Sequence, residues 1–488
     1  MKSDGHDESL YLCLDQGGHS SRALVIDLQG QIRAQASHPI DTRRADTHVE
    51  HDPRQLVDTL RRSADAALAQ LGPLAGNVVA AGLATQRSSM LCWDKDTGLA
   101  LTPVLSWQDT RAADWLEDFS EHWSRVHEIT GLVLSAHYGV SKMVWCLQHM
   151  PEVAGAAEQD RLQCGPLASF LAMQLTEGEA FADPANASRT LLWDRSTRDW
   201  SDELLALFGV SRKLLPPAVP SRFDWGKLST AHGELPLPVV TGDQSAALFA
   251  FGRPAVDVCF ANLGTGAFLQ RVLPCSDVDP GRLLASVVYQ DAGDATTVVE
   301  GTVNGAGSAL SEVAKQLHMG KDDLHAGSAA WLNGNDDPPL FINGVAGLGS
   351  PWWLTDVDTG FAGSASANPE AQIAGVLESI VFMLCVNLQH MERLPGSVNH
   401  LVATGGLASV DPLLQRLSDL SGLPVDRAMV REATATGLAC LLAGLPESWP
   451  GVTVEASYQP QPADALQARF AAWQQAMPPA AVTGEPVC

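Results

Sequence analysis

Short apolar runs alternate with turns rich in glycine and hydroxyl groups at the start of the chain. The runs predict strands at residues 10–14, 23–27, 31–35 and 78–83, and a helix at residues 53–71. Asp52 and Pro53 favour that helix start, because aspartate caps a helix and proline is tolerated at its first position. The turn Gly17–Ser21 joins the first two strands into a predicted β-hairpin. This order of elements indicates a mixed α/β layer with functional residues in its loops.

The same layout of strand, glycine turn and strand returns in the second half of the chain. Residues 256–261 and 267–272 predict two strands around the turn Asn262–Gly266. Between the two hairpins, helical stretches are predicted at 112–122, 140–149 and 166–175. The two hairpins share few identical residues, so only the pattern repeats. The repeat predicts two related α/β lobes that each present one glycine turn to a shared cleft.

Helical spacing dominates the rest of the sequence. A long helix is predicted from Pro369, with Asn368 as its cap. It is followed by a strand at 400–404 and by helices at 411–421, 432–442 and 461–476. We divide the chain into a disordered N-terminus (1–9), an N-terminal lobe (10–245), a C-terminal lobe (246–445) and a C-terminal helix with a tail (446–488).

Composition narrows the class of protein. The chain has 488 residues, of which 45% are hydrophobic, and a net charge of −25. This length suits two or three domains, and the acidic charge argues against nucleic acid or an anionic membrane as a partner. No uninterrupted apolar run is long enough for a membrane helix, and no signal peptide is visible. The nine cysteines are scattered without zinc-ligand spacing, which favours reduced thiols and a cytoplasmic location.

One stretch near the middle, Leu237–Gly252, combines a strand, a tight turn and a carboxylate at the start of a small-residue helix. The carboxylate is Asp243, and helix N–H groups together with the helix dipole should keep it ionised. Such a group is either a simple N-cap or a proton acceptor. Taken alone, the N-cap is the better interpretation, because aspartate is a common cap.

Other residues supply what phosphoryl transfer requires, namely phosphate positioning, a divalent metal and a base. The turns Gly17–Ser21 and Gly264–Gly266 could hold phosphates through main-chain N–H groups, and Asp15 could bind Mg²⁺. Gly405 and Gly406 would let a nucleoside approach the backbone closely. Each feature also has an ordinary structural interpretation as a turn. No P-loop lysine pattern, G-x-S-x-G elbow or H-E-x-x-H motif occurs in the sequence.

Eight motifs in order along most of the chain resemble those of the FGGY carbohydrate kinases, and among them the glycerol kinase branch most of all. The motifs are Asp15-Gln-Gly-x-x-Ser-Ser-Arg22, Val49-Glu-His-Asp-Pro53, Thr85-Gln-Arg87, Trp107-Gln-x-x-Arg111, Asn186-Ala-Ser-Arg-Thr190, Gly242-Asp-Gln244, Gly264-Thr-Gly266 and Gly405-Gly406. A single motif is weak evidence, whereas eight in register are strong.

The resemblance implies two actin-like, ribonuclease H-like lobes that close over ATP, Mg²⁺ and a polyol or sugar. By motif match, Asp243 would be the general base and Asp15 a metal ligand. The acceptor would be bound by Arg87, Ser88, Trp107, His137, Asp243 and Gln244. The nucleotide and its phosphates would be bound by Gly18, Ser20, Ser21, Arg22, Gly264, Thr265, Gly266, Gly305, Gly405 and Gly406.

The sequence departs from the glycerol kinase pattern at several of these positions. Gly18 and His19 stand where the family has two threonines, and we expect His19 to be an exposed turn residue. Ser88 replaces the carboxylate of the family's Arg-Glu pair, and His137 takes an aromatic position. Val410-Asp411 replaces an Asn-Asn pair near the adenine. Since buried hydrogen-bonding groups discriminate strongly, Ser88 and His137 predict an acceptor larger than glycerol or of a different shape.

These features together predict an ATP-dependent kinase that phosphorylates a hydroxyl of a small polyol or sugar. Two alternatives remain open at this point. One is a pentulose kinase of the xylulose or ribulose type, and the other is a catalytically weak sensor that binds a sugar or nucleotide with the same fold. A homodimer or a homotetramer is compatible with the kinase and with both alternatives.

Overall fold

The computed structural model describes residues 9–362, 368–450 and 452–478, which form two compact units. Unit 1 consists of Met1–Pro254, Ser286–Thr297 and Val430–Val452, and unit 2 of Ala255–Ala285, Val298–Met429 and Thr453–Cys488. The expected disordered N-terminus, apart from Ser9, and the end of the expected tail lie outside the described residues.

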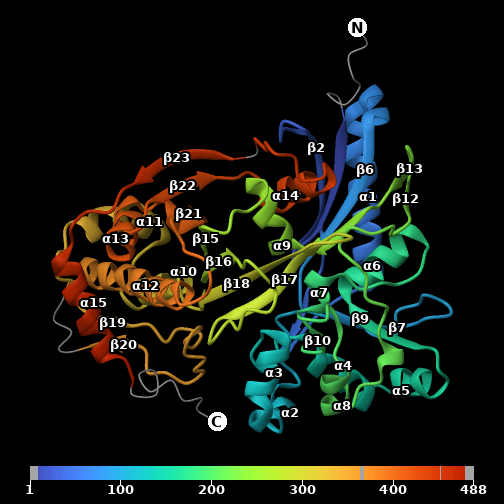
Figure 1. The fold of residues 1–488 in the computed structure, drawn as a ribbon, viewed down its shortest axis with the longest axis horizontal. Coiled ribbons are helices and arrows are strands. Elements are labelled where there is room, and N and C mark those ends of the chain that lie inside the picture. The colour runs from blue at the N-terminus through green and yellow to red at the C-terminus, as the bar shows by residue number, and fades with distance from the viewer. Residues whose placement is uncertain (1–8, 363–367, 451, 479–488) are drawn as a thin grey trace. The chain divides into compact units, whose positions relative to one another are not determined.

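A five-stranded mixed sheet forms the centre of unit 1, in the order β14-β6-β1-β2-β3. Its strands are β1 (Leu10–Gln16), β2 (Ser20–Asp27), β3 (Ile32–Pro39), β6 (Val78–Thr85) and β14 (Val239–Gly242). The hairpin pairs β1–β2 and β2–β3 are antiparallel, whereas β1–β6 and β6–β14 are parallel. Helices α1 (Pro53–Leu71) and α14 (Ala433–Leu442) pack against this sheet (Figure 1). The expected helix at 53–71 is confirmed, with Asp52 as its N-cap.

A second sheet of unit 1 has the order β4-β5-β8-β7-β9. Its strands are β4 (Arg43–Ala45), β5 (His48–His51), β7 (Met90–Asp94), β8 (Val104–Leu105) and β9 (Leu162–Pro166). The nearby helices are α4 (Gly139–His149), α5 (Pro151–Glu158) and α6 (Leu167–Thr176). The single helix expected at 112–122 is wrong. The chain forms α2 (Ala113–Glu117), a 3₁₀ turn (Ser120–His122) and α3 (Trp123–Thr130). α2 ends at Glu117, and the ring of Phe119 just after it packs against Trp115 and Phe208.

Within the seven-stranded sheet β17-β18-β16-β15-β21-β22-β23, the strands of unit 2 repeat the arrangement of the first sheet. Residues Ser286–Thr297, which include most of β17 and the start of β18, are counted with unit 1. The strands are β15 (Val258–Leu263), β16 (Ala267–Val272), β17 (Leu284–Gln290), β18 (Ala295–Val303), β21 (His400–Thr404), β22 (Val425–Met429) and β23 (Thr453–Tyr458). From β18 to β22 the pairings are antiparallel, antiparallel, parallel and parallel. The same sequence of pairings runs from β3 to β14 in unit 1, so the predicted repeat of pattern is a repeat of topology.

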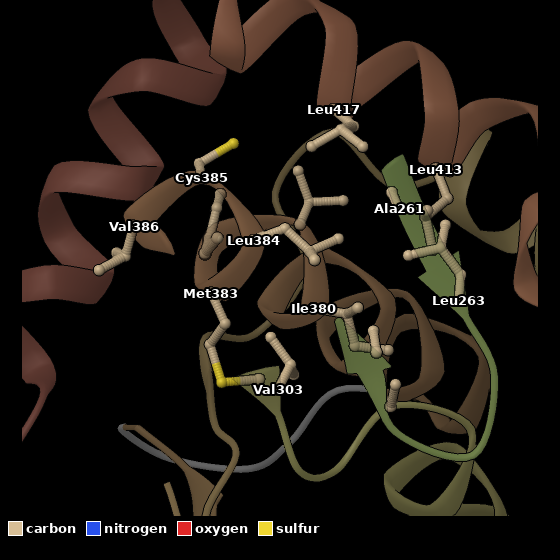
Figure 2. Close-up of a cluster of buried hydrophobic side chains, with 14 of the residues drawn as sticks. Ala261, Leu263, Val303, Ile380, Met383, Leu384, Cys385, Val386, Leu413 and Leu417 are labelled. Carbon is tan, nitrogen blue, oxygen red and sulfur yellow. The ribbon is translucent and has the colours of Figure 1, made fainter. Parts of the chain in front are cut away.

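A long apolar helix, α12 (Pro369–Glu392), forms the core of unit 2 together with α13 (Asp411–Ser421). Figure 2 shows their side chains gathered over residues of β15 and β18. Asn368 caps α12 by accepting a hydrogen bond from the amide of Ala371 at 2.8 Å, as predicted. The helix is long and apolar enough to cross a membrane, but 94% of its apolar window is buried inside the fold. In this structure α12 is therefore a core helix of unit 2.

The C-terminal helix α15 (Asp464–Ala476) starts three residues later than the expected start at 461. It was expected to be a polar helix, but one of its faces is buried in the core. Leu466, Phe470 and Trp473 are buried, and the indole N–H of Trp473 donates to the carbonyl of Phe341 at 2.9 Å. The other elements are α7 (Pro184–Ala187), α8 (Asp202–Phe208), α9 (Asp243–Leu248), α10 (Gly307–Gln316), α11 (Lys321–Asn333), β10 (Trp193–Asp194), β11 (Asp199–Trp200), β12 (Lys227–Thr230), β13 (Gly233–Pro236), β19 (Phe341–Ile342) and β20 (Gly360–Phe361).

Candidate active site

Three neighbouring parallel strands of unit 1 end at the same edge of the sheet. Gln16 of β1, Thr85 of β6 and Gly242 of β14 lie in one row of the register. The next residue of each strand is Gly17, Gln86 and Asp243, respectively. In α/β sheets, ligands bind beyond the carboxyl ends of parallel strands, where backbone groups are not used by the sheet. The topology therefore brings the predicted phosphate turn, acceptor residues and base to one place.

Asp243 is the first residue of α9 and is half-buried. The N-cap position belongs to Gly242, and the Asp243 carboxylate accepts a hydrogen bond from the amide of Gln244 at 2.7 Å. The interpretation of Asp243 as the N-cap is therefore wrong. Burial raises its pKa to about 6, Asp15 adds to this rise, and the guanidinium of Arg87 opposes it. Desolvation thus outweighs the helix N–H groups, although a carboxyl with a pKa of about 6 is still mostly ionised at pH 7.

Asp15, the proposed metal ligand, lies at the end of β1 and is almost fully buried. Arg22, its register partner on β2, forms an ion pair with its carboxylate and a second ion pair with Glu432. Burial raises the pKa of Asp15 although the charge of Arg22 lowers it. Glu432 precedes α14 and has a positive φ of 51°, which is unusual for a residue with a side chain. The sequence prediction missed Glu432, for which no spacing signal exists.

The turn between β1 and β2 is narrow. The amide of Gly17 donates to the carbonyl of Ser20 at 3.1 Å, and Gly18 and His19 lie between them, His19 being exposed as expected. The hydroxyl of Ser21 lies inside the unit, where it contacts the hydroxyl of Thr59 at 2.6 Å and donates to the amide oxygen of Gln16 at 2.7 Å. Ser21 thus supports the turn from within, whereas Gly18 and Ser20 remain at its outer side as candidates for phosphate contact.

Arg87 reaches from the end of β6 across the end of β14. Its guanidinium donates to the side-chain oxygen of Gln244, next to Asp243. A Cβ on Gly242 would lie 2.5 Å from two carbons of the Arg87 side chain. Glycine at position 242 is therefore required for this close approach, which holds two predicted acceptor residues and the predicted base together.

Three buried side chains beside Asp243 and Arg87 carry polar atoms without a hydrogen-bond partner in the described part of the chain. They are Gln86, Ser88 and Ser245. Ser88 also has a positive φ of 63°, and such strain in a residue with a side chain clusters at functional sites. A buried polar atom without a partner costs about 1–3 kcal/mol, so these groups indicate a site that a polar ligand completes. Gln86 and Ser245 were not among the predicted site residues.

Trp107 and His137 lie together at ring centroids 5.4 Å apart. His137 is held by Lys142, whose buried amino group donates to the carbonyls of Ala136, His137 and Tyr138 at 2.6, 2.8 and 3.2 Å. Burial keeps the pKa of His137 well below its usual value, and the charge of Lys142 lowers it further. These two rings therefore form a neutral aromatic surface, which suits the carbon side of a polyol better than a charged group.

The predicted nucleotide residues converge within unit 2 around the turn between β15 and β16. The amide of Gly307 donates to the carbonyl of Gly264 at 3.0 Å, and the amide of Ala306 donates to that of Thr265 at 3.1 Å. A Cβ on Gly266 would lie 3.0 Å from the carbonyl oxygen of Asn304. These contacts tie the turn to the start of α10.

Three further predicted glycines belong to the same region of unit 2. Gly405 has a φ of 93°, and a Cβ there would lie 2.6 Å from the carbonyl oxygen of Leu263, just before the turn. Gly406 opens a 3₁₀ turn that leads to α13. The carbonyl of Gly305 accepts a hydrogen bond from the side chain of Asn343 at 2.7 Å. The fold thus brings the six predicted residues of unit 2 into one glycine-rich region, in which Thr265, Gly405 and Gly406 are exposed and Gly305 is buried.

The donor atoms of the site fit a magnesium ion carried by a phosphate ligand. Among the described residues, no group of three or more His, Cys, Asp and Glu side chains is placed to hold a metal by itself. Magnesium keeps several waters and is bound through one or two carboxylates plus substrate phosphates. The carboxylate of Asp15 is the group of this site that would hold the ion.

Family models and known proteins match most of this chain. Residues 10–252 match the family model "FGGY family of carbohydrate kinases, N-terminal domain", and residues 259–444 match the C-terminal domain of the same family. A glycerol kinase of Bordetella parapertussis is 33% identical over 96% of each chain. Among solved structures, Plasmodium falciparum glycerol kinase with ADP has a TM-score of 0.84 at 21% identity, covering 96% of this chain and 97% of that one. A xylulose kinase of Rhodospirillum rubrum has a TM-score of 0.83 at 20% identity, covering 96% and 98%.

The two solved structures share the fold, which confirms the predicted class of two actin-like, ribonuclease H-like lobes. The family models and the curated relative extend over most of the chain, as the eight motifs do. The chain therefore belongs to the FGGY family of carbohydrate kinases, enzymes that transfer a phosphoryl group from ATP to an alcohol group of a polyol or sugar.

Proposed function

We propose that this protein is a polyol kinase of the glycerol kinase type, with Asp243 as general base and Mg²⁺–ATP as phosphoryl donor. The observation that carries the proposal is the row of strand ends in unit 1. There Asp243, with its pKa of about 6, lies beside Arg87 and shares the sheet edge with Asp15. A base with a pKa near neutrality can both accept a proton and be largely ionised at working pH.

The residues of unit 1 divide the work of the reaction. Asp243 accepts the proton of the acceptor hydroxyl as that oxygen attacks the terminal phosphorus. Arg87 orients Asp243 through Gln244 and offsets negative charge as it develops. Asp15 would hold the metal, which when bound neutralises charge on the phosphates. Arg22 would direct its guanidinium towards the phosphates and keep its ion pair with Glu432.

The nucleotide is proposed to bind to the glycine-rich region of unit 2 formed by Gly264, Thr265, Gly266, Gly305, Gly405 and Gly406. Exposed main-chain N–H groups without intervening side chains suit phosphate oxygens. The cleft expected between the two lobes, the domain boundaries and the oligomeric state stay predictions. A cytoplasmic location also stays a prediction, supported by the eight described cysteines, which are all free thiols.

The acceptor is proposed to be a short uncharged polyol. The neutral pair Trp107–His137 would contact its carbon side, and Arg87, Ser88 and Gln244 its hydroxyls. Curated relatives named glycerol kinase support glycerol or a close analogue. Serine is smaller than the glutamate of the family pattern, so Ser88 leaves more room in the site. This supports an acceptor with one carbon more than glycerol.

A panel of acceptors tests this proposal directly. We expect ADP release with glycerol and with a four-carbon polyol, and at least tenfold lower kcat/KM with xylulose, ribulose and gluconate, because a site matched to one set of hydroxyls rejects others strongly. Coupled measurement of ADP, with a control lacking acceptor, gives the values. A preference for a ketose would replace the polyol assignment by the pentulose kinase alternative. Nucleotide binding without turnover of any acceptor would favour the sensor.

The activity is expected to depend on pH through Asp243. The base works when deprotonated, and its pKa is about 6, so kcat/KM for the acceptor should fall about tenfold per pH unit below pH 6 and level off above it. Initial rates between pH 4.5 and 8 at saturating Mg²⁺–ATP measure this limb. A rate that stays constant down to pH 4.5 would rule out Asp243 as the base.

A further inference from the structure

Gln86 occupies the centre of the strand row described above. It follows β6, which lies between β1 and β14, so its neighbours in the row are Gly17 of the phosphate turn and Asp243. Adjacent strands are about 4.8 Å apart, so Gln86 is one strand away from each. Its backbone amide donates to the carbonyl of Gln16 at 2.8 Å, which fixes its backbone.

The carboxamide of Gln86 points at the phosphate turn. A Cβ on Gly18 would lie 3.5 Å from its side-chain oxygen, which places the amide beside that glycine. The residue is 2% exposed, and neither the oxygen nor the nitrogen of its amide has a hydrogen-bond partner among the residues the structure describes. A glutamine amide can make up to four hydrogen bonds, and burying it with none is costly.

The surroundings of Gln86 indicate what satisfies this amide. Its neighbours along the chain and across the row are Arg87, Ser88 and Asp243, all proposed to bind the acceptor, and on the other side the turn proposed to bind phosphate. Gln16, the buried glutamine at the end of the neighbouring strand, has a partner for its amide oxygen in Ser21, whereas both amide atoms of Gln86 lack one among the described residues. The orphaned amide is therefore placed between the two reactants and not within the core.

We propose that Gln86 is a substrate-contacting residue at the junction between phosphoryl group and acceptor. Its amide N–H group donates to an oxygen of the transferring phosphoryl group, and its carbonyl accepts the hydrogen of an acceptor hydroxyl. The oxygen of the acceptor forms the new bond to phosphorus, the bond from phosphorus to the leaving ADP oxygen breaks, and the proton goes to Asp243. Gln86 gains and loses no atoms. This assignment rests on the proposed function.

The test is the isosteric substitution Gln86→Met, which keeps the volume and removes both polar groups. Because no internal hydrogen bond is lost, we expect the melting temperature without ligands to be equal to or higher than that of the wild type. We expect kcat/KM for the acceptor to fall about 10- to 1000-fold, the range for loss of a group that stabilises a transition state. Gln86→Glu, which brings a negative charge to the phosphoryl group, should be at least as inactive.

The matched control is Gln270→Met on β16. Gln270 is also a buried glutamine, its amide nitrogen has no hydrogen-bond partner in the described chain, and it has no part in the proposed site. We expect its kcat/KM to stay within about twofold of the wild type.

Two results would overturn the role of Gln86. One is wild-type kcat/KM in Gln86→Met, and the other is a lower melting temperature of that variant without ligands, which would show that the amide has partners inside the protein. The melting result applies even if no acceptor is turned over. Failure of the polyol kinase assignment is recognised separately, as an inactive wild type on the acceptor panel.

Discussion

Replacement of Asp243 by asparagine is expected to lower kcat about 10²- to 10⁴-fold, which is the usual contribution of a general base. Asparagine keeps the size of the side chain and can still accept the hydrogen bond from the amide of Gln244. It cannot take a proton from the acceptor hydroxyl. Binding of Mg²⁺–ATP should change little, since the nucleotide is proposed to bind to unit 2. Steady-state kinetics and titration calorimetry with ATP separate the two quantities.

Asp202→Asn is the matched control for this variant. Asp202 is likewise the first residue of a short helix, α8, but its carboxylate is exposed and paired with Arg212. We expect its kcat to stay within about twofold of the wild type, because surface ion pairs contribute little. Unchanged turnover in Asp243→Asn would end the mechanism proposed above. The remaining activity of that variant should also lack the acidic limb of the pH profile.

The second large effect is expected from Gly437→Ala, which adds one methyl group to α14. That helix packs against α9, and a Cβ at position 437 would overlap the carbonyl oxygen of Ala246 and lie 2.9 Å from the amide nitrogen of Ala250. Both are backbone atoms, so no side chain can rotate away. Overpacking of this kind costs about 1–3 kcal/mol, occasionally more. We expect a lower melting temperature together with a lower kcat, because α9 carries Asp243.

A second glycine-to-alanine substitution separates packing from helix propensity. Gly155 lies in α5, and a Cβ there would have no heavy atom within 4 Å. Gly155→Ala should therefore raise the stability slightly, by up to about 1 kcal/mol, since alanine is the better helix former. If Gly437→Ala were equally harmless in thermal melting and kinetics, the close contact of α14 with α9 would not restrict position 437.

Local signals were sufficient for most elements and for the class of the enzyme. The caps Asp52 and Asn368 predicted the starts of α1 and α12, because a short polar side chain before a proline and an apolar helical pattern depends only on neighbouring residues. The motifs around Asp15, Asp243 and Gly264 predicted the family for the same reason. The break in the helix expected at 112–122 was not predicted. Phe119, beside the break, packs against Phe208, which is distant in sequence.

The properties of the site depend on contacts between distant segments. The pKa of Asp243 is set by burial, Arg87 and Asp15. The local sequence at the helix start therefore predicted the wrong capping role and could not reveal that burial raises this pKa. Glu432 meets Arg22 although 410 positions separate them. Gln86 lies within the motif Thr85-Gln-Arg87, but the sequence assigned it no role. Its proposed role follows from its place between β1 and β14 and from its unsatisfied amide. Residue types and their order thus determine the fold and the kind of chemistry, because these follow from periodicity and short motifs. The pKa of a site residue, its burial and the residues that it contacts depend on the tertiary structure. The order of the strands in the sheet brings together segments that no local pattern connects.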